Sequence, residues 1–236
     1  MSVRKLYLDR GIGETRGVVT LDGAPERLLI ARDGDGPLTQ LGARLVGRVR
    51  KVEPAFASAF IDLGGVEALM SFKPDARPVE GQAIEVEIRS EPRDGKLATV
   101  RLIGPAEGKP RLLAAAPDIA EQLTFFARDT TIIEGREARA MADAAEAEAL
   151  ETFHPLPGGG DLAIEPTRAL VAIDVDVGER KGQDVKRVTR AANHTALAES
   201  ARLLRLKGLG GIVVIDLVGR GHDGNALLTG LGYVRP

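Results

Sequence analysis

The chain of 236 residues contains no cysteine, which excludes disulfide bonds, thiolate zinc sites and cysteine nucleophiles. It also lacks any apolar run of the roughly 18–20 residues that a membrane-spanning helix requires. The first ten residues, MSVRKLYLDR, become charged too early to form the core of a signal peptide. Because a reducing compartment is the simplest setting for a chain without cysteine, we expect a cytoplasmic protein with no membrane partner.

Neither sign of charge is in large excess. The chain has 32 basic and 34 acidic side chains, a net charge of −2, which argues against a general polyanion binder. The charges are unevenly distributed, because acidic side chains predominate in residues 114–151 and basic ones in residues 179–207. A basic face of this kind could concentrate phosphate groups, whereas the simpler interpretation is that both segments form ordinary solvent-exposed helix faces.

The first hundred residues have the pattern of short strands separated by turns. Three strands are expected at residues 5–8, 17–20 and 27–31. Five more strand-like segments follow, and in one of them apolar residues alternate with charged ones. These segments are residues 44–51, 57–62, 67–71, 83–90 and 96–102. Five short strands in about 60 residues predict a small β-barrel of the OB type.

The second half has a different pattern, which begins after a stretch rich in glycine and proline at residues 104–110. Residues 136–151 are rich in alanine and glutamate and predict a helix. A strand at 170–177, a helix at 189–207 and a strand at 212–217 predict a βαβ unit with parallel strands. We divide the chain into N-terminal strands, an inserted barrel and an α/β core, at residues 1–42, 43–104 and 105–236.

Acidic side chains end both strands of the βαβ unit. Asp174 and Asp176 follow one aliphatic run and Asp216 follows the other. Because ligand sites gather at the carboxyl ends of parallel strands, we expect Asp174 and Asp216 to share one hard cation, magnesium or manganese. We also expect these strand ends to be buried, where unpaired carboxylates would be costly. The alternative is that each acid caps its strand or pairs with Arg180 or Lys181.

The order of motifs resembles that of the bacterial ribonuclease E/G family. In the second half the resembling segments are LPGGG (156–160), EPTRALVAIDVD (165–176), Asn193, LRLK (204–207) and LGGIVVID (209–216). In the barrel they are VEP (52–54), AFID (59–62), EGQ (80–82) and GK (95–96). The resemblance implies a ribonuclease H-like or DNase I-like nuclease core with an inserted five-stranded OB-fold barrel.

The same resemblance implies a function. The chain would be an endoribonuclease that cleaves single-stranded RNA in RNA processing or decay, with magnesium held by Asp174 and Asp216. Asp176 occupies a third functional position, where the family has an asparagine that would orient water or the scissile phosphate by hydrogen bonding. An aspartate adds negative charge there, which would strengthen metal binding or repel the phosphate.

On the barrel, the resemblance assigns base stacking to Phe60 and an RNA contact to Lys96. A second family aromatic falls at Leu69, so one stacking platform is weakened, which should lower affinity without abolishing it, since stacking contributes ~1–3 kcal/mol per base. From the sequence alone, Phe60 is equally a core residue of the barrel. Further phosphate contacts are expected from basic side chains, although a solvated strand face explains the barrel ones nearly as well. These basic residues are Arg48, Arg50, Lys51, Arg180 and Lys181.

Departures from the family pattern support other interpretations. The cysteine pair by which larger members share zinc is missing, so no zinc and no zinc-linked assembly are expected. Beyond Asp216 the family's later helices and its basic Arg-Phe-Gly segment are not recognisable. The first alternative is therefore a catalytically weak or inactive RNA-binding protein on the same scaffold. The second is a metal-dependent hydrolase of small phosphate esters, against which the barrel argues.

Overall fold

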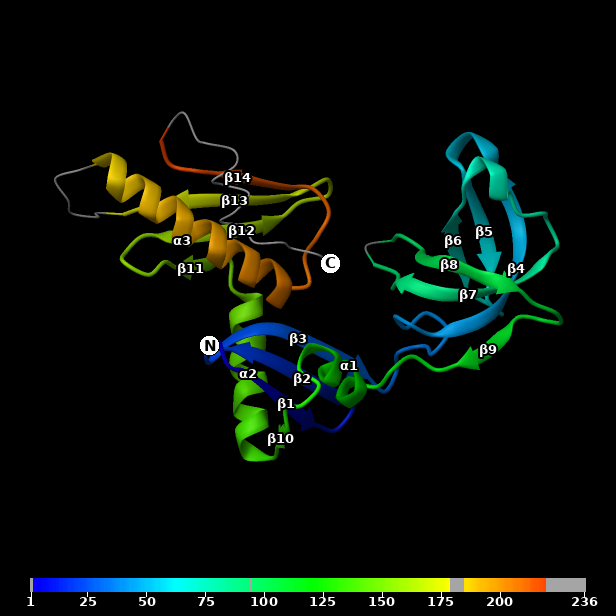
Figure 1. Ribbon diagram of the computed structural model, residues 1–236, viewed down its shortest axis with the longest axis horizontal. Helices are drawn as coiled ribbons and strands as arrows, with labels where there is room; N and C mark the ends of the chain where they lie inside the picture. The colour runs from blue at the N-terminus through cyan, green and yellow to red at the C-terminus, as the bar shows by residue number, and fades with distance from the viewer. Residues whose placement is uncertain (1, 94, 179–184, 220–236) are drawn as a thin grey trace. The chain divides into compact units, whose positions relative to one another are not determined.

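A computed structural model describes residues 2–93, 95–178 and 185–219 of the protein. The chain forms two compact units (Figure 1). The first unit combines Met1–Ile30 with Leu123–Pro236, and the second is Ala31–Gln122. Each unit has a hydrophobic core of its own. None of the described helices is long and apolar enough to cross a membrane.

The second unit contains a closed five-stranded barrel. Its strands are β4 (Arg44–Glu53), β5 (Ser58–Asp62), β6 (Glu67–Ser71), β7 (Ala83–Ser90) and β8 (Ala98–Pro105), with the short helices η1 (Pro54–Phe56) and η2 (Pro74–Ala76) in two connections. The ring runs β4-β5-β6-β8-β7 and closes on β4, and only β6 and β8 are parallel within it. Alternate side chains such as Ile61 and Met70 fill the interior. This closed barrel fits the OB fold, as the alternating sequence predicts.

The glycine- and proline-rich stretch at 104–110, next to the expected boundary at 104/105, lies inside the second unit. Strand β9 (Arg111–Ala114) returns and pairs antiparallel with β4, so the barrel sheet continues past this stretch. Gly108, with φ +91°, makes the turn, and the Arg111 side chain donates to the carbonyl oxygens of Glu107 and Lys109. The units divide at residues 30/31 and 122/123 instead of the expected 42/43 and 104/105.

The first unit contains two four-stranded sheets. One is formed by β1 (Arg4–Arg10), β2 (Glu14–Leu21), β3 (Ala24–Arg32) and β10 (Ile132–Glu134), in the order β10-β1-β2-β3, and β10 is parallel to β1. The short helix α1 (Ile119–Phe126) precedes β10. The helix α2 (Arg136–Leu150) packs on this sheet, and its buried face consists of Ala138, Ala142 and Ala145, whose small side chains allow close approach.

The other sheet contains the expected βαβ unit. Its strands are β11 (Phe153–Pro155), β12 (Asp161–Pro166), β13 (Val171–Asp176) and β14 (Val213–Asp216), in that order. The helix α3 (Val185–Leu206) connects β13 to β14, which are parallel as predicted, whereas the first three strands are antiparallel. Leucines of α3 and the apolar side chains of β12 and β13 form one core with the α2 alanines. One face of this sheet is therefore buried, and the opposite face is open to solvent.

Candidate active site

The two acids expected to hold a cation are direct neighbours in the sheet. Asp174 of β13 is the register partner of Asp216 of β14. Adjacent strands lie ~4.8 Å apart, and register partners point to the same face, so both carboxylates project from one face at neighbouring positions. Two such groups are close enough to share one ion. The predicted adjacency of the two strand ends is confirmed, and the shared cation stays a prediction.

These carboxylates are exposed, so the expectation that their strand ends are buried is wrong. Along β13 the residues Val171, Ile173 and Val175 are buried in the core, and the side chains between them face solvent. The aliphatic run therefore covers one face of the sheet only, the face next to α3. The cost of burying unpaired carboxylates is therefore no reason to expect a cation here. The case for a cation rests on the proximity of Asp174 to Asp216 alone.

Asp176 lies on the same face, two residues beyond Asp174, but its side chain takes part in a turn. One oxygen, Oδ1, accepts a hydrogen bond of 2.7 Å from the backbone N–H of Gly178. Behind it, the backbone of Gly160 approaches so closely that a Cβ there would lie 2.1 Å from the carbonyl oxygen of Asp176. With φ +75° at Gly160, only glycine fits, which explains the LPGGG motif as a device that fixes the end of β13.

Asn193 fixes the neighbouring strand end. This α3 residue is 5% exposed, and its side-chain amide forms two hydrogen bonds with the backbone of Val218. Nδ2 donates to the carbonyl oxygen at 2.9 Å, and Oδ1 accepts from the N–H at 3.2 Å. Because Val218 is two residues after Asp216, the amide anchors the chain where it leaves β14. The sequence places Asn193 in the motif series, but this positioning contact becomes visible only in the structure.

The donor set suits a hard cation that keeps part of its water shell. Mg²⁺ is commonly held by one or two carboxylates together with waters and substrate phosphate oxygens, and Asp174 and Asp216 provide two. Over the described residues, no three His, Cys, Asp or Glu side chains are grouped so that they could hold a metal ion. Asp176 is therefore not a third ligand in this arrangement.

The basic side chains late in α3 are engaged inside the unit and do not form a free phosphate-binding face. Arg202 pairs with Glu148 and Glu199 and donates to the carbonyl oxygen of Pro25 at 2.5 Å. Burial opposes its charge, but the hydrogen bonds to the two glutamates outweigh this effect and raise the pKa of Arg202. Lys207 donates to the carbonyl oxygens of Ala149 and Glu151.

Arg205 behaves in the same way, with an ion pair of 3.0 Å to Glu26. Arg202, Arg205 and Lys207 are thus not free to concentrate phosphate groups, as the basic block 179–207 suggested. Arg180 and Lys181 lie outside the described residues.

On the barrel, Phe60 and Lys51 are brought together. Phe60 is half-buried on the outer side of β5, between its register partners Lys51 of β4 and Leu69 of β6. It is therefore not a core residue of the barrel. Lys51 is exposed, and the hydrogen bond that its ammonium group donates to the Glu53 carboxylate raises the pKa of Lys51, while the carboxylate offsets part of its positive charge. Beside Leu69, a surface hollow of about 440 Å³ extends past Lys73.

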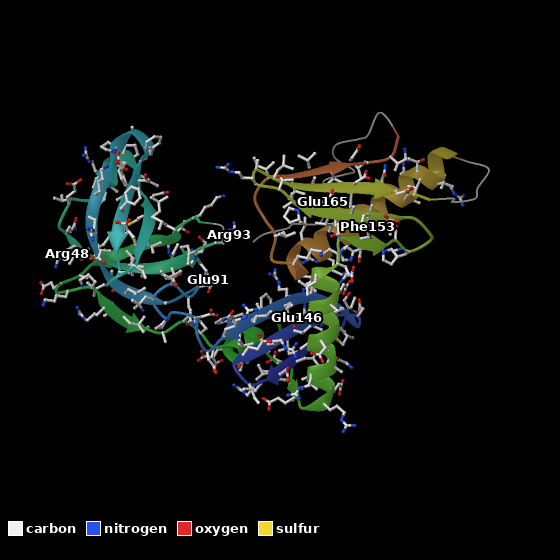
Figure 2. All side chains as sticks on the ribbon, turned by 180° about the vertical axis from the view of Figure 1, so that it is seen from behind. Arg48, Glu91, Arg93, Glu146, Phe153 and Glu165 are labelled. Atoms are coloured by element: carbon white, nitrogen blue, oxygen red, sulfur yellow. The ribbon has the colours of Figure 1, made fainter. Side chains whose placement is uncertain are left out.

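Arg48 and Lys96, which are also expected to bind RNA, are not register partners of Phe60. Arg48 donates to the carbonyl oxygens of Gly81 at 2.8 Å and Gly108 at 3.0 Å, so it has a structural role in joining two turns. Lys96 is exposed in the connection between β7 and β8, where its backbone pairs with Arg93. Figure 2 labels Arg48 and Arg93 on this unit.

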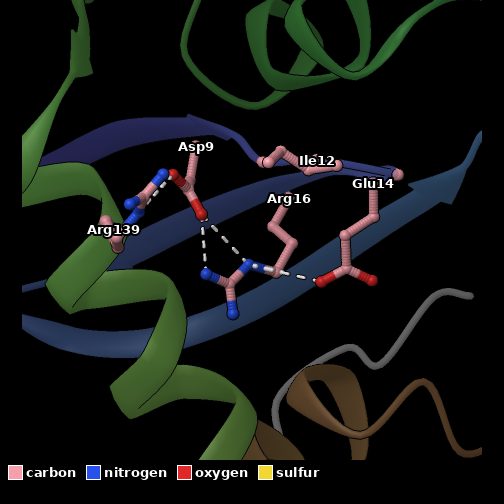
Figure 3. Close-up of a pocket in the computed structure, with 7 residues that line it drawn as sticks. Asp9, Ile12, Glu14, Arg16 and Arg139 are labelled. Carbon is pink, nitrogen blue, oxygen red and sulfur yellow. Dashed lines mark hydrogen bonds and ion pairs between the residues drawn. The ribbon is translucent and has the colours of Figure 1, made fainter.

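A second hollow, of about 450 Å³, lies at the turn between β1 and β2 (Figure 3). Its charged groups satisfy one another: Arg16 pairs with Asp9 at 2.6 Å, and Arg139 pairs with the same carboxylate at 3.3 Å. The hydrogen bond from Arg16 is the main cause of the lowered pKa of Asp9. Arg16 also reaches Asp143 and Glu146 of α2. This cluster joins the helix to the sheet and has no sequence signal of its own.

Comparison with known proteins places the second half of the chain. The family model of the Ribonuclease E/G family matches residues 111–226. This segment of the chain belongs to the family.

Individual ribonucleases show the same similarity. Ribonuclease E of Escherichia coli K12 is 42% identical over 64 residues, which are 27% of this chain and 6% of that protein. Ribonuclease E of Synechocystis is 42% identical over 72 residues, 30% of this chain and 11% of the relative. A putative ribonuclease E of Buchnera aphidicola subsp. Baizongia pistaciae is 42% identical over 64 residues and is covered to 16%. The alignments thus span a small part of these relatives.

The ribonuclease E/G match includes Asp174, Asp176 and Asp216, so the exposed sheet face lies within the family segment. The barrel strands β4–β8 precede residue 111 and lie outside it. Assignment of the barrel therefore rests on its strand order, and assignment of the sheet rests on both the family match and the geometry.

Proposed function

We propose that this chain is an endoribonuclease that hydrolyses phosphodiester bonds of single-stranded RNA in RNA processing or decay. The observation that carries the proposal is the register pairing of Asp174 with Asp216 on a solvent-open face, within the segment that matches the ribonuclease E/G family. Family membership supports a ribonuclease function in general. We take the sheet β11–β14 with α3 as the ribonuclease H-like or DNase I-like nuclease core.

The cofactor in this proposal is Mg²⁺ or Mn²⁺, held by Asp174 and Asp216. Such a cation, when bound, lowers the pKa of water and neutralises charge on the phosphodiester. Asp176 would orient the attacking water through Oδ2, because Oδ1 is occupied by the Gly178 N–H. Gly160 packs against the backbone of Asp176, and Asn193 anchors the chain two residues after Asp216, so both would help to position these acids.

RNA binding is assigned in part to the barrel. Phe60 and Leu69 lie side by side on its outer surface, where bases would stack or pack, with Lys51 next to them for the phosphate backbone. Lys96 is exposed and accessible to the same ligand class, whereas Arg48 contributes mainly to barrel structure. The proposed ligand is single-stranded RNA, since stacking requires unpaired bases.

The test is a time course of cleavage of a 5′-labelled single-stranded RNA with added Mg²⁺. We compare the wild type with Asp174→Asn, Asp216→Asn and an EDTA control. Glu165→Gln serves as the matched control, because Glu165 is an exposed acid on the same sheet face, two residues from Ala163 (Figure 2). Internal cleavage that is lost in both aspartate variants and in EDTA but kept in Glu165→Gln would support the proposal.

Other outcomes select the alternatives. If no variant cuts the RNA but the RNA still shifts in a gel, the chain is an RNA-binding protein, an alternative motivated by the aspartate at position 176, where the family has an asparagine. If mononucleotide esters are hydrolysed and RNA is not, the chain is a hydrolase of small phosphate esters. Cleavage that survives both aspartate substitutions would contradict the site assignment.

A further inference from the structure

An exposed aromatic ring shares the open sheet face with the paired aspartates. Phe153 of β11 is 67% exposed, whereas the following residue, His154, is buried on the opposite side of the sheet. Figure 2 labels Phe153 and Glu165 on this sheet. Single exposed apolar residues are common, so exposure alone carries no argument for a function. The argument for a function comes from the position of Phe153 relative to the paired aspartates.

One cross-strand row connects the ring to the site. Phe153 is the register partner of Ala163, Ala163 of Asp174, and Asp174 of Asp216. Register partners point to the same face, and each step across the sheet is ~4.8 Å, which places the Cα atoms of Phe153 and Asp174 about 10 Å apart. Ala163 between them has a short side chain, so nothing in this row rises between the ring and the carboxylates.

Phe153 also adds an aromatic ring to this face, on which the other described side chains are not aromatic. The neighbouring rows contribute further acids, Asp161 and Glu165, which repel a bare phosphate chain and leave an uncharged, flat ligand group as the favourable partner of the ring. A nucleobase is such a group, and every base can stack on an aromatic side chain. The phosphates of the same strand would be favoured only at Asp174 and Asp216, where a cation compensates their charge.

We propose that Phe153 is a base-stacking subsite that holds one nucleotide of single-stranded RNA near the scissile phosphate. The proposal rests on the proposed ribonuclease function and extends it, because it assigns an RNA contact to the nuclease sheet itself and not only to the barrel. The ring acts as a positioning and binding residue and takes no part in the chemistry.

A fluorescence experiment tests the contact without requiring cleavage. The chain contains no tryptophan, so Phe153→Trp introduces a single reporter at this position. Phe125→Trp is the matched control, because Phe125 is 66% exposed but lies on α1. On mixing with oligoadenylate RNA and Mg²⁺ in a stopped-flow instrument, we expect the emission at position 153 to be quenched before products accumulate, and the emission at position 125 to stay constant. Absence of quenching at position 153 would contradict the proposal.

A cleavage experiment tests the role. Phe153→Ala should lower kcat/KM on single-stranded RNA by roughly 5- to 150-fold, the effect of losing one stacked base, whereas Phe153→Tyr and Phe125→Ala should stay near the wild type. An RNA with one abasic nucleotide at the stacked position should lower the wild-type rate equally and leave the Phe153→Ala rate unchanged.

The two proposals fail in distinguishable ways. If cleavage depends on Asp174 while Phe153→Ala cuts as fast as the wild type, the stacking subsite is wrong and the nuclease assignment stands. If no protein cuts RNA but position 153 is quenched, the nuclease assignment is wrong and the base contact stands. If Phe153→Ala changes the oligomeric state and leaves RNA affinity unchanged, the ring belongs to a protein interface, which overturns the subsite.

Discussion

Burial disfavours the charged form of the His154 imidazole in the folded protein. The ring is 4% exposed, and its Nε2–H donates to the carbonyl oxygen of Glu151 at 3.2 Å. Burial first, and then the nearby Lys207 charge, lower the pKa of His154 below its ordinary value of 6.5. The unfolded chain therefore takes up a proton near pH 6.5, whereas the folded chain takes it up only at lower pH, and stability must fall as the pH decreases from 6.5 towards the folded pKa.

We predict that thermal unfolding of the wild type shifts to lower temperature between pH 7.5 and pH 5.5, and that His154→Gln loses less stability over the same interval. The comparison isolates the contribution of this imidazole, since all other titrating groups are shared. A proton NMR titration of the imidazole should give a pKa below 6.5. An equal loss of stability in both proteins would show that burial does not lower the pKa of this imidazole.

For single residues, the sequence predicts the positions of the two aspartates in the sheet better than it predicts the environment of their side chains. Asp174 and Asp216 could be located because each ends an aliphatic strand, and parallel strands bring their carboxyl ends together. The solvent exposure of these two carboxylates could not be predicted, because an aliphatic run does not reveal which of its alternate side chains a helix covers. Phe153 had a weak signal, an aromatic that alternates with the buried His154, but its row depends on long-range register.

The contact between α3 and the segment after β14 provides an element-scale prediction. Asn193→Ala removes both hydrogen bonds to Val218 in a buried setting, which should cost about 1–3 kcal/mol of stability. Because the anchor lies two residues beyond Asp216, divalent-cation affinity should fall as well, measured by calorimetry with Mn²⁺. Hydrogen exchange at Val218 should become faster.

Thr195→Ala on the same helix is the control, since its hydroxyl donates only to the carbonyl oxygen of Ala191 within α3. It should leave Mn²⁺ affinity and exchange at Val218 unchanged. Loss of stability without loss of Mn²⁺ affinity in Asn193→Ala would mean that the amide supports the fold but does not position Asp216.

Elements with a strong local pattern could be predicted, whereas most of the shortest strands could not. The five barrel strands and α2 were located to within a few residues because alternation and helix-forming composition are local signals. The strands β9, β10 and β11 have three or four residues each, too few for a pattern, and exist through pairing with distant partners. The turn at 104–110 illustrates the same limit, because a sequence rich in glycine and proline predicts a bend without indicating whether the chain returns to the same sheet.

At the scale of the whole molecule, the two charge blocks of the sequence are complementary to each other. The acidic block includes α2 and the basic block includes α3, and Arg202 joins them through Glu148. Lys207 extends the connection to the backbone at the end of α2. Part of the basic charge that suggested an RNA-binding helix is thus used in contacts between α3 and α2. The sequence did not indicate these contacts, because the two helices are far apart along the chain.

Separate cores in the two units predict two unfolding transitions. Residues 31–122 contain no tyrosine, and Tyr7 is buried in the core of the other unit, while Tyr233 lies outside the described residues. Ile61→Ala should lower barrel stability by about 2–5 kcal/mol, because Ile61 is fully buried there. Far-UV circular dichroism should then show an earlier first transition, while the tyrosine near-UV signal keeps its wild-type midpoint.

Leu162→Ala, in the core of the first unit, should do the reverse and shift the tyrosine signal. Val79→Ala, at an exposed barrel position, should move neither transition, since surface substitutions usually change stability by less than about 0.5 kcal/mol. A shift of the tyrosine midpoint in Ile61→Ala as large as that in the far-UV signal would mean that the barrel and the β11–β14 sheet unfold as one cooperative body. In that case a ligand that stabilises the barrel would also stabilise the aspartate face, because a ligand that binds one folded body raises the stability of all of it.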